Sequence, residues 1–155
     1  MNDEERFSSP VEARKKAMDY LARREHARGE LTRKLETAGF DTDIAADAIQ
    51  RLAEEGLQSD RRFVESFVQS RINQGKGPTR IHADLGERGI ASGLIDEILE
   101  DSGEDWHALA RKIRVKKFGS ALPVDFKEKA RQMRFLQYRG FEPDQIQLAV
   151  SAQDE

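Results

Sequence analysis

A pattern of apolar residues followed by glycine returns three times along this chain, at intervals of about fifty residues. Its copies are Leu31, Leu35, Gly39 and Phe40, then Ile81, Leu85, Gly89 and Ile90, and finally Leu136, Gly140 and Phe141. Self-similarity at an interval of this size indicates a chain built from similar structural units in tandem. One such unit is too small to bury its own apolar faces, and stacking three units would cover them.

Each copy of the pattern predicts the end of one helix and the start of another. The apolar residues lie four apart, on one face of a helix, and the glycine follows where a helix ends in a left-handed residue. We therefore expect positive φ at Gly39, Gly89 and Gly140. The next helix has an expected N-cap at Asp41 in the first copy and at Ser92 in the second, and Pro143 occupies the first turn in the third.

A further helix precedes the pattern in every unit. Its apolar residues at three-to-four spacing are Ala13, Ala17, Tyr20 and Leu21, then Phe63, Val64, Phe67 and Val68, and then Trp106, Leu109, Ala110 and Ile113. No segment alternates apolar and polar residues for long enough to predict a strand. The sequence therefore predicts an all-α chain of three tandem three-helix repeats, over residues 11–58, 59–102 and 103–150, in an elongated, curved array. Residues 1–10 and 151–155 are expected to be disordered.

Composition places limits on the compartment and the core. Apolar residues make up 37% of the 155 residues and charged residues 35%, which suits thin helical layers better than one deep core. The chain has no cysteine, so it forms no disulfide and no thiolate metal site, as is usual in a reducing compartment. It also has no run of eighteen apolar residues and no apolar secretion signal near its N-terminus. We expect a soluble cytoplasmic protein.

No arrangement of residues in the sequence specifies an active site. His26, His82 and His107 fall in three different repeats without metal-ligand spacing, so we expect them to be surface or helix-end histidines. The stretch GKGP at 75–78 lacks the spacing of a phosphate-binding loop and follows a predicted helix, which favours a tight turn with Lys76 and Arg80 beside it. The sequence predicts no enzyme, no catalytic residue, no metal and no cofactor.

The distribution of cations is more informative than the net charge of -3. The last helices of the first two repeats are acidic, which disfavours their insertion into a DNA groove. Cations gather instead on the first and second helices, where they form either ordinary solvated faces or a partner surface. The candidates are Arg24, Arg28, Arg71, Lys76, Arg80, Arg111, Lys112, Arg114, Lys116 and Lys117. The run from 111 to 117 is the densest, and we expect its cations to flank a buried side made by Leu109 and Ile113.

Four spaced blocks of residues follow one another along the chain. The first runs from Tyr20-Leu21 through Arg24-Glu25-His26 to Gly39-Phe40, the second from Asp60 through GKGP to Gly89-Ile90, the third from Ala110 to Gly119, and the fourth from Phe135 to Ile146. In this order the blocks resemble the RecX family. One departure is Ala27, where the family often has serine. The resemblance covers about residues 13–150.

The resemblance implies three tandem three-helix repeats and a regulator of the bacterial recombinase RecA. Such a chain would bind the RecA filament on single-stranded DNA and would inhibit the ATPase, strand-exchange and coprotease activities of RecA. From the charge distribution we expect the cations named above to make the contact, and we expect a monomer that does not bind a membrane. Whether DNA is contacted directly stays open, because the chain is acidic overall. The alternative is a DNA-binding helical repeat protein that uses the basic run of residues 103–150.

Overall fold

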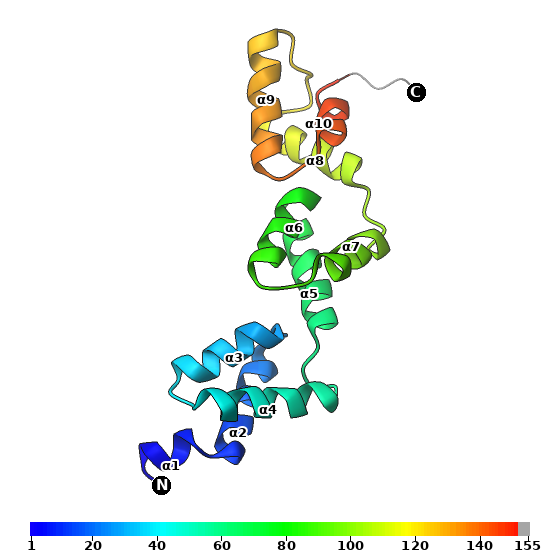
Figure 1. Cartoon of the computed structure of the whole chain (residues 1–155). Coiled ribbons are helices and arrows are strands. Elements are labelled where there is room, and N and C mark those ends of the chain that lie inside the picture. Colours follow the sequence, from blue (N-terminus) through cyan, green and yellow to red (C-terminus); the bar gives the residue numbers. More distant parts are fainter. Residues whose placement is uncertain (152–155) are drawn as a thin grey trace. The chain divides into compact units, whose positions relative to one another are not determined.

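The computed structural model describes residues 1–151, and every regular element among them is an α-helix, which confirms the expected class. The helices of this part of the chain (Figure 1) are Asp3–Phe7 (α1), Pro10–Arg23 (α2), Arg28–Thr37 (α3), Thr42–Glu54 (α4), Asp60–Asn73 (α5), Pro78–Glu87 (α6), Ser92–Asp101 (α7), Trp106–Phe118 (α8), Phe126–Tyr138 (α9) and Pro143–Ala149 (α10). The groups α2–α4, α5–α7 and α8–α10 are the three expected three-helix repeats.

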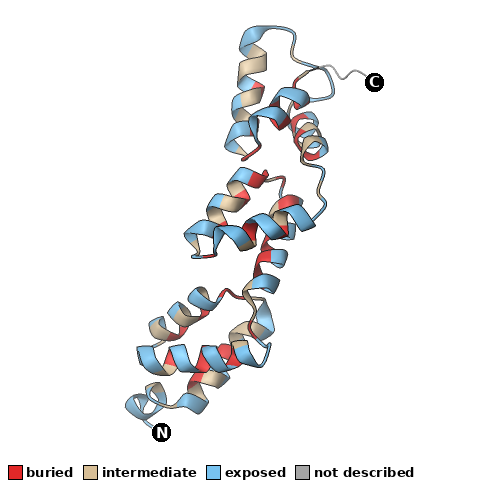
Figure 2. Cartoon of the chain, turned by 45° about the vertical axis from the view of Figure 1, so that its right-hand side comes forward, coloured by how far each residue is buried: buried red, intermediate tan, exposed pale blue. Residues whose placement is uncertain are grey.

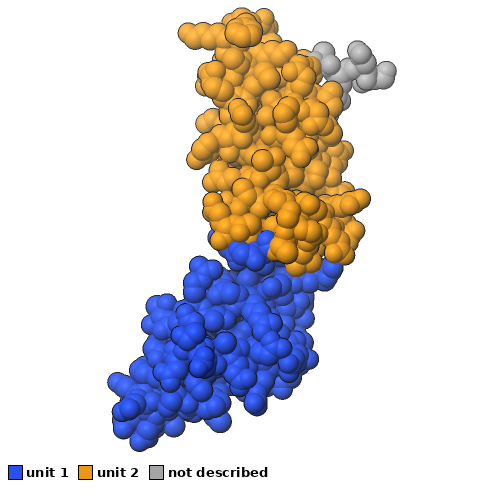
Figure 3. Space-filling model, viewed as in Figure 1, with its two compact units in different colours: residues 1–66, 88–90 blue, residues 67–87, 91–155 orange. Residues whose placement is uncertain are grey.

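The chain divides into two compact units, coloured separately in Figure 3. Unit 1 comprises residues 1–66 and 88–90, and unit 2 comprises residues 67–87 and 91–155. The division falls inside α5, so this helix contributes its first half to unit 1 and its second half to unit 2. The repeat boundaries at 58 and 102 and the elongated, curved arrangement stay predictions.

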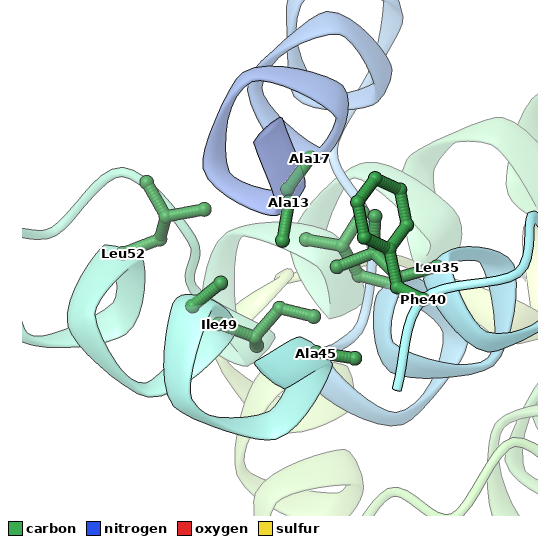
Figure 4. Close-up of a cluster of buried hydrophobic side chains, with 9 residues drawn as sticks. Ala13, Ala17, Leu35, Phe40, Ala45, Ile49 and Leu52 are labelled. Atoms are coloured by element: carbon green, nitrogen blue, oxygen red, sulfur yellow. The ribbon is translucent and has the colours of Figure 1, made fainter. Parts of the chain in front are cut away.

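The core of unit 1 is made by the facing sides of α2, α3 and α4. Figure 4 shows the small side chains of Ala13 and Ala17 pointing from α2 toward Ile49 on α4. Leu31 and Leu35 complete the cluster from α3 and are fully buried. Burying a leucine or isoleucine side chain contributes about 1.5–3 kcal/mol, so a few such residues stabilise a thin core.

The turn between α3 and α4 confirms the expected helix stop at Gly39. Gly39 has φ of 114°, the Gly39 N–H donates to the Glu36 carbonyl at 3.0 Å, and the Phe40 N–H donates to the Leu35 carbonyl at 3.0 Å. These two bonds satisfy carbonyls that the helix end would otherwise leave unpaired. The turn also directs Phe40 back into the core, where it is buried.

The expectation that residues 1–10 are disordered is wrong. They form α1 and a connection to α2, with Ser9 as the N-cap of α2 and Pro10 in its first turn. Phe7 holds α1 in place through two contacts. Its ring lies edge-on to the Phe40 ring, with the ring centres 5.5 Å apart, and its carbonyl accepts a hydrogen bond from the Asp41 N–H at 3.0 Å. At the other end, residues 152–155 of the expected disordered tail lie outside the described residues.

His26 stands at a helix end as expected, just before α3, but it is buried rather than on the surface. Its Nδ1 lies 3.0 Å from the Arg24 carbonyl oxygen, and a carbonyl can only accept, so Nδ1 carries the hydrogen. The other ring nitrogen, Nε2, therefore accepts from the Lys34 ammonium at 2.9 Å. Burial, together with the charges of Arg24 and Lys34, lowers the pKa of His26 below its ordinary value of 6.5.

The second and third repeats meet in unit 2 through a contact between backbones. The GKGP stretch is the turn between α5 and α6, as expected, and it lies against the turn after α9. The Gly77 N–H donates to the Arg139 carbonyl at 2.8 Å, and the Thr79 N–H donates to the Gly140 carbonyl at 2.9 Å. A Cβ at Gly77 would lie 2.4 Å from the Gly140 carbonyl group, so a side chain there would separate the two turns.

The expected glycine conformation is confirmed at the other two repeats, with φ of 80° at Gly89 and 97° at Gly140. The helix starts are confirmed in part. Pro143 is the first residue of α10, and Asp41 occupies the N-cap position of α4 without a capping side-chain bond. Ser92 is not a cap, because α7 already begins there and Ala91 takes the cap position.

Candidate partner-binding surface

Helix α8 lies beside the end of α5 and beside α9, and the three enclose a groove of about 680 Å³ within unit 2. Four cations line it: Lys112, Lys116, Lys117 and Arg139. Its apolar residues are Ile72, Leu109, Ile113 and Phe135, and the other lining residues are Asn73, Gln74, Gly75 and Glu104. With a single carboxylate among these residues, the groove suits an anionic partner that also has apolar groups.

The basic run on α8 is divided between this groove and the interior. Lys112 and Lys116 are exposed and one helical turn apart, as expected. Lys117 is also exposed, and its ammonium lies 5.8 Å from the centre of the Phe135 ring. Arg111 is half-buried. Leu109 is buried, as expected for α8. Ile113 was also expected to be buried, but it is half-buried and packs toward Gly75 at the end of α5.

The placement expected for Arg114, at the wet margin of α8, is wrong. This residue is 2% exposed, and its guanidinium donates to the Ala121 carbonyl at 3.2 Å and to the Gln132 side-chain oxygen at 3.3 Å. Longer contacts of 3.4 and 3.5 Å join it to the carbonyls of Gly119 and Ser120. Burial, with a smaller effect of Arg111, lowers the pKa of Arg114. The positive charge of Arg114 therefore interacts with the carbonyl oxygens of the loop after α8 and is not available to a partner.

Arg139 also lines the groove but is not among the residues predicted from the sequence, because it belongs to no run of cations. It is half-buried, its guanidinium donates to the Gln74 carbonyl at 3.1 Å, and it lies 5.4 Å from the centre of the Phe135 ring. The two partners of this hydrogen bond are 65 residues apart. Spacing within one repeat carries no signal for such a contact, because the groove forms only when two repeats meet.

Three candidates of the second repeat lie near its junction with the third. Arg80 donates to the Tyr138 carbonyl at 3.3 Å and lies 5.5 Å from the centre of the Tyr138 ring, so it joins the two repeats. The Arg71 guanidinium stacks on the Phe67 ring, with its central carbon 4.1 Å from the ring centre. Lys76 is half-buried in the GKGP turn, where its backbone N–H donates to the Arg71 carbonyl at 3.0 Å.

Arg24 and Arg28 belong to unit 1, whereas the other eight candidates belong to unit 2. The Arg24 guanidinium binds both carboxylate oxygens of Glu30, at 2.7 and 3.1 Å, and this hydrogen bond raises the pKa of Arg24. Burial alone would raise the pKa of Glu30, but the hydrogen bond and charge of Arg24 outweigh it and lower that pKa. Arg28 is exposed, and its guanidinium donates to Gln50.

Among residues 1–151, no group of three or more histidine, cysteine, aspartate and glutamate side chains is arranged to hold a metal ion. No helix in this part of the chain is both long enough and apolar enough to cross a membrane.

Three family models match this chain, in order and without overlap. They are described as the first, second and third three-helix domains of RecX, and they match residues 13–52, 59–99 and 104–150. Together the matches cover well over half of the chain. The chain belongs to the RecX family. This membership confirms the resemblance seen in the sequence, and each matched range contains one of the three glycine turns.

Curated RecX proteins are similar to this chain over nearly their whole length. Regulatory protein RecX of Halorhodospira halophila is 49% identical over 139 residues, which cover 90% of this chain and 86% of that protein. Regulatory protein RecX of Ectopseudomonas mendocina is 48% identical over 149 residues, which cover 96% of this chain and 99% of that protein. The name shared by these relatives supports a regulatory role for this RecX chain.

Two crystal structures of RecX proteins show the same fold. One, described as regulatory protein RecX, has a TM-score of 0.79 at 21% identity and covers 90% of this chain and 72% of the other. The other is RecX from Lactobacillus salivarius, with a TM-score of 0.72 at 22% identity and coverage of 91% and 94%. At this level of identity the comparison concerns the arrangement of helices alone.

Proposed function

We propose that this chain binds the RecA filament on single-stranded DNA and inhibits its ATPase, strand-exchange and coprotease activities, so that it modulates recombination and the SOS response. The observation that carries the proposal is the match of all three repeats, in order, to RecX domains. Regulation of RecA is what membership of this family implies. The chain acts as a monomeric, non-catalytic binding protein in the cytoplasm.

The repeat architecture supports binding to a polymer. When linked modules face a partner with repeating sites, the first contact raises the effective concentration of the next module near its own site. Weak contacts by single repeats then combine into strong binding, provided that the spacing of the modules matches that of the sites. A filament offers such repeating sites, whereas a single RecA subunit does not.

The groove of unit 2 is the part of the surface that we assign to this contact. The exposed side chains of Lys112, Lys116 and Lys117 line this groove with positive charge, and Arg139 adds a fourth positive charge. Arg24, Arg28, Arg71, Lys76 and Arg111 remain candidate contacts outside or beside it. Arg114 is omitted because it is buried, and Arg80 acts first as a link between the second and third repeats.

Charge reversal at the groove tests this assignment. Lys112→Glu combined with Lys116→Glu should leave helicity and thermal stability nearly unchanged, because both side chains are exposed. The variant should weaken inhibition of RecA ATPase and raise the dissociation rate from the filament by about tenfold or more, and added salt should narrow the difference. The matched control is Lys15→Glu with Arg23→Glu, which makes the same charge change at exposed positions of unit 1. Equal inhibition by both variants would rule out the groove.

The alternative function is DNA binding through the basic run of the third repeat, which the exposed lysines of α8 favour. Salt-titrated binding to bare single-stranded DNA, to RecA alone and to the assembled filament separates the two functions. Tight filament binding with weak bare-DNA binding supports the proposed function. Tight binding to bare DNA that falls steeply with salt supports the alternative.

A further inference from the structure

The groove of unit 2 has an apolar part that the chain leaves incompletely covered. Ile113 on α8 and Phe135 on α9 are both half-buried, and Ile72 and Leu109 are buried side chains in the same lining. Only two of the 13 residues of α9 are buried, and Figure 2 accordingly shows this helix almost wholly in the colours of exposed and half-buried residues. An apolar group of a partner therefore gains favourable contact in the groove, because it removes Ile113 and Phe135 from water.

The cations of the same groove have no carboxylates to neutralise them. Helix α8 contains five cations and no carboxylate. Among residues 1–151, none of Lys112, Lys116 and Lys117 forms an ion pair, and Glu104 is the single carboxylate of the lining. Cations in a last helical turn also stabilise the helix end, which accounts in part for Lys116 and Lys117 but not for Lys112, one turn earlier. The charge of the groove therefore favours an anionic occupant.

The uncharged polar groups of the groove suit a peptide backbone. Asn73 and Gln74, at and directly after the end of α5, are exposed, and a side-chain amide both donates and accepts hydrogen bonds as a peptide group does. The Asn73 side-chain oxygen already accepts from the Gln69 amide at 3.0 Å, so the N–H groups of Asn73 are available to a carbonyl. The carboxylate of Glu104 only accepts, which suits a peptide N–H and repels a phosphate.

We propose that the groove binds a short acidic segment of a protein, with one apolar side chain against Ile113 and Phe135 and with carboxylates beside the exposed lysines of α8. The apolar side chain is the anchor, and the water that it excludes strengthens the ion pairs around it. This inference rests on the proposed function, in which the segment belongs to the protein component of the filament. It adds the chemistry that the groove recognises.

Single-stranded DNA fits the groove less well than an acidic segment does. The bases of single strands bind proteins by stacking on aromatic rings. Phe135 is the one aromatic residue among the described lining residues, and its ring centre already has the Lys117 ammonium at 5.8 Å and the Arg139 guanidinium at 5.4 Å. The other apolar lining residues are aliphatic, so they suit an apolar side chain and offer no ring to a base.

The first measurement uses the whole chain and a fluorescent peptide, without RecA. The probe is the peptide Asp-Glu-Leu-Glu-Asp with blocked ends, and its comparison peptide has serine in place of leucine. The apolar contact is tested on the peptide because replacing Ile113 would disturb its packing against Gly75. We expect the leucine peptide to bind about tenfold more tightly than the serine peptide, as burial of one leucine side chain implies, and both to bind more weakly as salt is added.

The site of binding is located with the variant Lys112→Gln with Lys116→Gln, which removes two charges at exposed positions and keeps good helix formers there. The matched control is Lys15→Gln with Arg23→Gln, at exposed positions of α2. Circular dichroism and thermal unfolding check that both variants fold as the wild type does. We expect the groove variant to bind the leucine peptide about fivefold more weakly and the control to bind it as the wild type does.

In the second measurement, the leucine peptide competes for the chain with RecA filaments assembled on single-stranded DNA. Displacement of the wild-type chain from filaments supports both the inference and the proposed function. If the chain binds the peptide in the groove but binds no filament, the proposed function fails and the preference for an acidic segment stands. If the chain binds filaments and the peptide does not displace it, the inference alone is overturned. If the chain binds neither, both fail.

Three further results would overturn the inference. Equal binding of the leucine and serine peptides would show that no apolar anchor enters the groove. Tighter binding of a thymidine oligonucleotide than of the peptide, lost in the groove variant, would assign the groove to nucleic acid. Oligomers of the chain in sedimentation that the peptide dissolves would assign it to a second copy.

Discussion

The first and third repeats end their second helix with the same turn but place that turn against different neighbours. In both, a glycine with positive φ follows the helix, and the next N–H returns to the carbonyl of a buried leucine, Leu35 in one repeat and Leu136 in the other. The local hydrogen bonds are thus the same, and the difference lies in what surrounds each glycine.

Gly39 lies against a side chain, whereas Gly140 lies against a backbone. A Cβ at Gly39 would come within 2.7 Å of the Phe7 ring, which could move aside. A Cβ at Gly140 would lie 2.2 Å from the Arg80 Cβ and 2.6 Å from the Arg80 backbone nitrogen. One turn motif therefore serves two purposes, because in the third repeat the backbone of the turn also packs directly against the second repeat.

The same two repeats also bury different polar groups. The first repeat buries His26, kept neutral by burial and by the Lys34 ammonium, and the third buries Arg114, which keeps its charge and is surrounded by carbonyl oxygens. A buried polar group is tolerated when its hydrogen bonds are made, and the cost appears when they are removed.

Replacing Gly140 with alanine should have the largest effect on stability. The left-handed conformation costs a residue with a side chain about 1–2 kcal/mol, and the clash with the Arg80 backbone adds about 1–3 kcal/mol. We expect a loss of roughly 3 kcal/mol in the free energy of unfolding, measured with denaturant. The matched control is Gly89→Ala, where φ is also positive but a Cβ would meet nothing within 4 Å, and which should cost only about 1 kcal/mol. Equal losses in the two variants would show that the backbone contact between repeats contributes nothing.

Replacing Arg114 with methionine should have the next largest effect. Methionine fills a similar volume but removes the bonds to the loop carbonyls and to Gln132, and hydrogen bonds of a charged group contribute about 1.5–3 kcal/mol. We expect a loss of about 2 kcal/mol and faster amide hydrogen exchange in residues 119–124. Arg111→Met on the same helix is the control and should change neither quantity appreciably, because Arg111 is only half-buried. Unchanged exchange in the loop of the Arg114 variant would contradict its role as a clamp.

Replacing Gly39 with alanine should cost less than replacing Gly140, about 1.5 kcal/mol, because the Phe7 ring can shift while the strained φ remains. A double-mutant cycle with Phe7→Ala separates the two causes. If the clash with the Phe7 ring contributes to the loss, Gly39→Ala lowers the free energy of unfolding less in the Phe7→Ala background than in the wild type. The same cost in both backgrounds would assign the whole effect to the backbone conformation.

The helices and glycine turns could be predicted from the sequence because they depend on residues close together in the chain. The spacing of Leu31, Leu35 and Gly39 is enough to place a helix and its end. The order of residues 1–10 could not be predicted in this way, since it depends on Phe7 meeting Phe40. A short polar segment with one phenylalanine carries no periodic signal.

Less of the candidate surface could be predicted from the sequence, because it too depends on contacts between residues far apart in the chain. A dense cationic run suggests exposed side chains, and this holds for Lys112 and Lys116. Arg114 is buried because the loop after α8 folds back and surrounds it with carbonyl oxygens, which no spacing on α8 foretells. The groove and its Arg139 arise from the meeting of two repeats, so they depend on packing and not on periodicity.

The smallest expected effect concerns pH and the neutral His26 of the first repeat. Because burial lowers the pKa of His26 in the folded state, the unfolded chain binds more protons as the pH falls below 6.5, so the free energy of unfolding decreases there. The stabilisation is fully present above that pH. The contribution of Glu30, whose folded pKa is lowered from 4.5, is lost only at more acidic pH, so the two windows separate. We expect His26→Asn, which keeps a donor near the Arg24 carbonyl but does not titrate, to show a weaker decrease in stability than the wild type between about pH 7.5 and about pH 5. Denaturant unfolding of the two proteins across this range measures the difference, and parallel curves would mean that His26 is not held neutral by the fold.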